Sequence, residues 1–124
     1  MLLRPTTEDE IETYRRDGII CMRAFFNKEW VMHLREMTER VMANPSPMHM
    51  PVDTAKTKGS SLFYFDTFLS HHMEGFCTAA YSSPAAEIAG ILMASSKVNL
   101  LLDQLLAKKP GALSPIVGHQ DATY

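Results

Sequence analysis

Apolar side chains recur with helical spacing in two stretches of the first 45 residues. Thr7 and Glu10 form a capping box at the start of the first stretch, and Gly18 suits its end, so we predict a helix over about 8–17. Asn27 can cap the second helix, which Asn44-Pro45-Ser46-Pro47 ends. Its apolar residues share one face and lie at Trp30, Leu34, Met37 and Val41.

The pattern is less regular between these helices and in the middle of the chain. The short apolar run Ile19–Phe26 predicts a strand. After a loop to about Ser61, Asp66 or Thr67 is expected to cap a third helix. That helix would carry Phe68, Leu69, His72, Met73 and Phe76. Ser83-Pro84 predicts the start of a fourth helix, with a shared apolar face at Ile88, Ile91 and Leu92.

The last quarter of the chain has a different character. Residues Val98–Ala107 are rich in leucine, which favours a strand covered on both faces, although the periodicity leaves a buried helix open. Lys108-Lys109-Pro110-Gly111 predicts a turn after this strand. A second loop then leads to His119-Gln120-Asp121.

Composition narrows the classes of protein. A length of 124 residues allows one domain at most, and a net charge of −2 gives no electrostatic case for nucleic acid or an anionic membrane surface. No apolar run approaches the roughly 18 residues of a membrane span, and the start of the chain lacks a signal-peptide core. Cys21 and Cys77 are too few for a disulfide framework, so we expect both to be reduced and buried in a cytoplasmic protein.

The tripeptide His119-x-Asp121 is the strongest candidate for chemistry. In an extended strand, residues i and i+2 point to the same side, so the imidazole and the carboxylate can reach one point. With a distant histidine they would make the facial triad that holds iron(II) and leaves three positions open. Alone, such a tripeptide is more often a loop pair or a surface hydrogen bond.

Two blocks of sequence give this tripeptide a context. The first runs from Glu10 to Phe26, E-x-x-x-Y-R-R-D-G-I-I-C-M-R-A-F-F, and continues into the following helix. The second runs from Ser83 to Tyr124 and contains S-P-A-A-E-I-A-G, D-Q-L-L-A-K-K-P-G and H-Q-D-A-T-Y. Together they cover well over half of the chain and resemble the phytanoyl-CoA dioxygenase family. Residues 43–62 contain no matching motif.

The resemblance implies an α+β chain with helices at 1–95 and, at 96–124, the first core strands of a double-stranded β-helix, the jelly-roll or cupin architecture. It also implies iron(II) as cofactor and 2-oxoglutarate as cosubstrate. His119 and Asp121 correspond to the first two iron ligands, and Leu105 corresponds to a residue that contacts the cosubstrate. Odd-numbered residues of the strand would then point inward, which aims Asp103 at the cavity unless it is an outward edge carboxylate.

One departure from the family concerns the rest of the site. The family's third ligand, a histidine, and the arginine that pairs with 2-oxoglutarate lie downstream of H-x-D, whereas this sequence ends at Tyr124. We therefore expect one incomplete, truncated domain, a fragment of an oxygenase for a small organic substrate that is inactive alone and has no evident protein partner. Of the other histidines, His33 is expected at the surface or in a hydrogen bond, His49 lies in the loop, and His71 and His72 are expected as a half-exposed pair in the third helix. The alternative is a helical, non-catalytic binding module.

Overall fold

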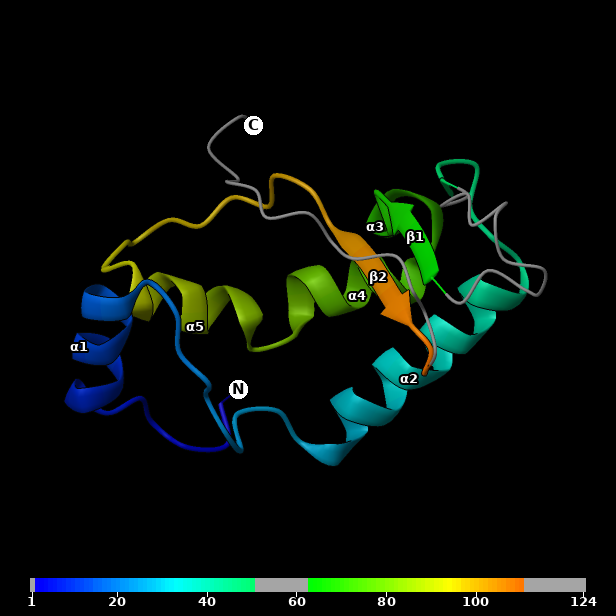
Figure 1. Cartoon of the computed structure of the whole chain (residues 1–124). Coiled ribbons are helices and arrows are strands. Elements are labelled where there is room, and N and C mark those ends of the chain that lie inside the picture. Colours follow the sequence, from blue (N-terminus) through cyan, green and yellow to red (C-terminus); the bar gives the residue numbers. More distant parts are fainter. Residues whose placement is uncertain (1, 51–62, 111–124) are drawn as a thin grey trace.

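The computed structural model describes residues 2–50 and 63–110. The chain is α+β, with helices and a two-stranded antiparallel sheet in the described part (Figure 1). The helices are α1 (Glu8–Asp17), α2 (Lys28–Ala43), α3 (Leu69–His72), α4 (Glu74–Ser82) and α5 (Ala85–Leu92). The strands are β1 (Phe63–Thr67) and β2 (Gln104–Lys108), so one strand comes from each of the two parts that the sequence distinguished.

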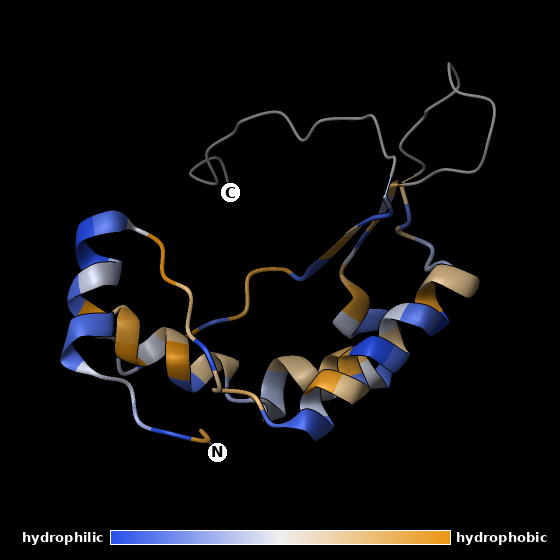
Figure 2. Cartoon of the chain, turned by 60° about the horizontal axis from the view of Figure 1, so that its bottom comes forward, coloured by the Kyte–Doolittle hydropathy of each residue, from blue (hydrophilic) through white to orange (hydrophobic). Residues whose placement is uncertain are grey.

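The two long amino-terminal helices begin and end where the sequence predicts. Thr7 and Glu10 form the capping box of α1, and Gly18 closes it in the left-handed conformation with φ 72°. The Asn27 side chain accepts a hydrogen bond from the Trp30 amide at the start of α2. Polar residues predominate in α1, whereas α2 carries both polar and apolar residues, as the colours of Figure 2 show. In the described residues, no helix is long and apolar enough to cross a membrane.

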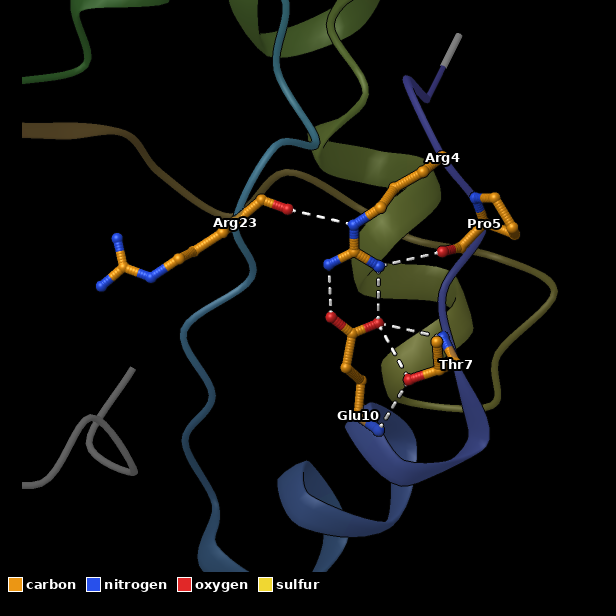
Figure 3. Close-up of polar contacts among 5 residues, drawn as sticks. All are labelled: Arg4, Pro5, Thr7, Glu10 and Arg23. Atoms are coloured by element: carbon orange, nitrogen blue, oxygen red, sulfur yellow. Dashed lines mark hydrogen bonds and ion pairs between the residues drawn. The ribbon is translucent and has the colours of Figure 1, made fainter.

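A cluster around Arg4 ties the chain start to α1 and to the segment before α2 (Figure 3). The Arg4 guanidinium donates to both carboxylate oxygens of Glu10, and its Nε donates to the Arg23 carbonyl at 3.1 Å. It also lies 4.1 Å from the centre of the Phe25 ring. The hydrogen bond from Arg4, with a second from the Thr7 amide, lowers the pKa of Glu10 from 4.5 to about 2.

This cluster predicts an acid-sensitive contribution to stability. Because the folded pKa of Glu10 is depressed, its contribution is present above about pH 4.5 and is lost as the pH falls toward 2. We expect the urea midpoint of the wild type to exceed that of Glu10→Gln at pH 6, and the difference to shrink through this window. The same midpoints for the exposed Glu12→Gln variant serve as the control. A wild-type excess that stays constant down to pH 2 would contradict the ion pair.

The predicted strand Ile19–Phe26 is wrong. A turn at Arg23-Ala24 interrupts it, with Ala24 at φ 60°, and Phe25 alone is fully buried. A strand needs a neighbour for its main-chain groups, and here Arg4 takes the Arg23 carbonyl instead. Cys21 is therefore exposed, contrary to expectation, and Cys77 is half-buried, while both remain free thiols.

The predicted third helix is two helices, and its expected cap is wrong. The backbone is extended at Met73, with φ −136° and ψ 118°, which separates α3 from α4. Asp66 and Thr67 belong to β1 rather than to a cap. Phe68 precedes α3 in the left-handed conformation, and a carboxylate from Asp103, distant in sequence, binds the first turn instead. The fourth helix is present as α5, and the Ala85 amide donates to Ser83 Oγ.

The core lies where α2, α3 and the sheet meet. Val41 and Leu69 are fully buried and pack against Tyr64. Leu105 and Ala107 of β2 pack on this cluster, as do Met42, Met73 and Phe76. Helix α4 approaches α2 at Gly75, where a Cβ atom would lie 2.0 Å from the Met37 sulfur. Glycine is therefore the residue that lets α4 lie close to α2.

The leucine-rich run forms a shorter strand than predicted, and it is not covered on both faces. Only residues 104–108 are strand, because β1 is five residues long and pairs over that length. Leu105 and Ala107 are half-buried, but Leu106 is 45% exposed and Leu101 is 70% exposed. The expectation that odd-numbered residues point inward thus holds for Leu105 and Ala107, while of the two odd-numbered residues before β2 Asp103 is half-buried and Leu101 is exposed.

Candidate functional site

An apolar groove of about 710 Å³ lies between α2, α4, α5 and the segment 98–105. Phe26 and Leu34 line it beside α2, Phe76 lines it from α4, and Leu101 and Leu105 line it from the leucine-rich run. Concave and mainly apolar surfaces of this size are typical of small-molecule sites. The groove is therefore the first place to look for a ligand among the described residues.

The two residues expected to face a cosubstrate both line this groove. Leu105 is half-buried between the groove and the core cluster. The Asp103 carboxylate also lies at the groove, and it accepts hydrogen bonds from the Ser70 amide at 3.0 Å and the Ser70 hydroxyl at 2.6 Å. Asp103 thus fixes the first turn of α3 to the segment entering β2. Contact of either residue with 2-oxoglutarate stays a prediction.

The most buried polar group that the structure describes is Asp66 of β1, with no exposed surface. Its carboxylate accepts a hydrogen bond from the Tyr64 hydroxyl at 2.6 Å and another from the Thr67 amide at 2.9 Å. The Ser46 amide donates at 3.1 Å to Asp66 Oδ2, the oxygen that Tyr64 also binds. The Ser46 hydroxyl donates to the other oxygen, Oδ1. This network joins the end of α2 to β1, and the Tyr64 hydroxyl oxygen also lies 3.1 Å from the Val41 carbonyl.

The charges of this network follow from burial and hydrogen bonding. Burial raises the pKa of the Asp66 carboxyl, but the hydrogen bonds from Ser46, Tyr64 and Thr67 outweigh it, and the net pKa lies below the ordinary value. Burial and the neighbouring carboxylate raise the pKa of Tyr64. Asp66 is therefore ionised and Tyr64 protonated at neutral pH, which makes both structural rather than acid–base groups.

His33 is in a hydrogen bond, as expected, whereas His71 and His72 are exposed rather than a half-exposed pair. His33 Nε2 lies 2.8 Å from the Gly75 carbonyl, and His49 Nδ1 lies 2.9 Å from the Phe65 carbonyl. The His49 ring also stacks on Tyr64 at 4.6 Å. His71 and His72 are exposed on α3. One ring nitrogen of His33 and of His49 thus has a main-chain partner, which gives these residues a role in packing.

The proposed iron ligands His119 and Asp121 lie outside the described residues. Within 2–50 and 63–110, no group of three or more histidine, cysteine, aspartate or glutamate side chains could hold a metal ion. The fit to iron(II) therefore rests on donor chemistry alone, one imidazole nitrogen and one carboxylate oxygen two residues apart. Of the predicted site residues, the structure brings together Leu105 and Asp103.

The hydrogen-bond networks of Asp66 and Asp103 were not predicted from the sequence. A signal for Asp66 was available, because Tyr64 and Asp66 are two apart in an otherwise aromatic run and so share one strand face. No local signal pairs Asp103 with Ser70, which lie 33 residues apart. The Asp103–Ser70 contact joins the segments that flank the paired strands, whereas Asp66 bonds within β1 and to Ser46.

Comparison with known proteins gives no match: no family model, no curated protein and no solved structure matches this chain. The resemblance to the phytanoyl-CoA dioxygenase family thus rests on the sequence motifs alone.

Proposed function

We propose that this chain contributes to a non-haem iron(II) and 2-oxoglutarate-dependent oxygenase that hydroxylates a small organic substrate. The observation that carries the proposal is the order of elements before the H-x-D tripeptide. Strand β2 turns Leu105 and Ala107 toward the core, it ends at Lys108, and Lys109-Pro110 follows it. This order agrees with the strand and turn that precede H-x-D in the phytanoyl-CoA dioxygenase family.

The residues would divide the work as follows. His119 and Asp121 would hold the metal, and Leu105 would contact the cosubstrate in the groove. Asp103, held by Ser70 at the start of α3, would position the segment that leads into β2. Iron(II) with 2-oxoglutarate and dioxygen would supply the oxidising chemistry, while the apolar lining would exclude water and orient the substrate.

We expect the 124-residue chain by itself to bind iron(II) weakly and to show no sustained succinate release. The family motif assigns only two iron ligands within these residues, and metal affinity depends on the number and geometry of ligands. The measurements are an anaerobic titration with cobalt(II), whose absorption spectrum reports ligation, and a succinate assay with iron(II), ascorbate and 2-oxoglutarate.

Each outcome of these measurements is informative. Cobalt binding that requires His119 supports the proposal, whereas an absence of any His119-dependent binding contradicts it. Sustained, metal-dependent succinate release from the purified chain would support the oxygenase and would show that another histidine of this chain completes the site.

The groove also favours a second candidate, a non-catalytic binding module. Its lining is mainly apolar, and Leu100, Leu101 and Tyr81 beside it are exposed. If metal binding is indifferent to both His119→Ala and Asp121→Ala, this second function is the better supported one.

A further inference from the structure

The main-chain groups along the outer edge of β2 can be placed from the ladder. The register pairs Phe65 with Leu106, and the Phe68 amide donates to the Asp103 carbonyl at 2.9 Å. Bonded and non-bonded pairs alternate in an antiparallel ladder. The pair of Phe68 and Asp103 is hydrogen-bonded, so the next pair, Thr67 and Gln104, is not. Two pairs further along the ladder, Phe65 and Leu106 are likewise not hydrogen-bonded to each other. The amides and carbonyls of Gln104 and Leu106 thus point away from β1.

The outer edges of the two strands are treated differently. On β1, the Phe65 carbonyl accepts a hydrogen bond from the Met50 amide at 3.0 Å and lies within hydrogen-bond distance of the His49 ring. On β2, the main-chain groups of Gln104 and Leu106 have no partner within residues 2–50 and 63–110. The Leu106 side chain is 45% exposed. An open edge with an exposed leucine is a template for another strand.

We propose that a second copy of this chain pairs with this edge, antiparallel and across a twofold axis at Leu105. Gln104 of each copy then lies opposite Leu106 of the other. Each of these two pairs exchanges two main-chain hydrogen bonds, which gives four bonds between the copies. The product is one sheet in the order β1-β2-β2-β1, with the same surface used by both copies.

Two features of the strand favour a second copy over another partner. In this register Lys108 lies opposite Leu102 of the other copy, so no like charges face each other. The amides and carbonyls that would form the hydrogen bonds between the copies are those of Gln104 and Leu106, so every copy carries both halves of the pairing surface. A two-stranded sheet is marginal by itself, and four strands gain stability from pairing.

The test is the mass of the full chain in solution, by sedimentation velocity and light scattering over a wide concentration range. We expect the mass to rise with concentration from 13.9 kDa to twice that value. Gln104→Lys combined with Leu106→Lys places like charges opposite each other, so we expect a monomer. Gln104→Lys combined with Leu106→Glu places opposite charges together, so we expect the dimer to return.

A matched control separates strand pairing from general apolar association. Leu101 is 70% exposed but lies outside β2, so Leu101→Gln, which removes the apolar side chain without adding a charge, should leave the dimer intact. Far-ultraviolet circular dichroism verifies that each variant folds. A wild type that stays monomeric at every concentration overturns the proposal. So does a dimer that survives the lysine pair, or one that is lost in Leu101→Gln.

Discussion

Replacing Asp66 with alanine is expected to lower the free energy of unfolding by about 3 kcal/mol, because the change leaves several buried donors without an acceptor. The Tyr64 hydroxyl and the Ser46 and Thr67 amides all donate to this carboxylate. Asp66 has no exposed surface, so water cannot replace it. A loss of this size is a large part of the stability of a small domain.

Urea denaturation followed by circular dichroism measures this effect, with Glu12→Ala as a matched control. Glu12 is an exposed carboxylate within α1, so its removal should change stability by less than about 0.5 kcal/mol. Asp66→Asn should fall between the two, because an amide oxygen accepts some of the bonds and its NH₂ group opposes the donors. An Asp66→Ala variant as stable as Glu12→Ala would show that the network contributes little.

The second large effect concerns the proposed metal ligands. In any context in which the chain converts 2-oxoglutarate to succinate, His119→Ala and Asp121→Ala are each expected to abolish that activity and the bound iron. Two protein ligands come from this tripeptide, and the loss of either leaves the metal incompletely held. Elemental analysis measures the bound iron, and succinate release measures the activity. Full activity in either variant would refute the assignment.

Leu105→Ala provides the contrast, because Leu105 packs on the core and lines the groove. We expect weaker binding of 2-oxoglutarate together with a stability loss of about 2 kcal/mol, the lower end for such a truncation, since Leu105 is half-buried. His119→Ala should leave the melting temperature nearly unchanged. A melting loss in His119→Ala as large as that in Leu105→Ala would favour a structural histidine.

The sequence by itself determined the elements whose signals are local. Helix α1 begins at the Thr7 capping box and ends at Gly18, and α2 begins at Asn27, because caps act within one turn of the residues that make them. The face that α2 buries, at Met37 and Val41, also follows from spacing alone. For the candidate site, the family resemblance rather than the spacing predicted that Leu105 points inward, and the structure packs Leu105 on the core cluster.

Only the tertiary structure decided where apolar runs become strands. Ile19–Phe26 and Val98–Ala107 are both apolar runs predicted to be strands, yet only the end of the second pairs with β1. A strand is completed by hydrogen bonds to residues distant in the chain, which no local pattern records. The same reason applies to the Asp103–Ser70 contact, which takes over the capping role predicted for Asp66, and to the open edge of β2.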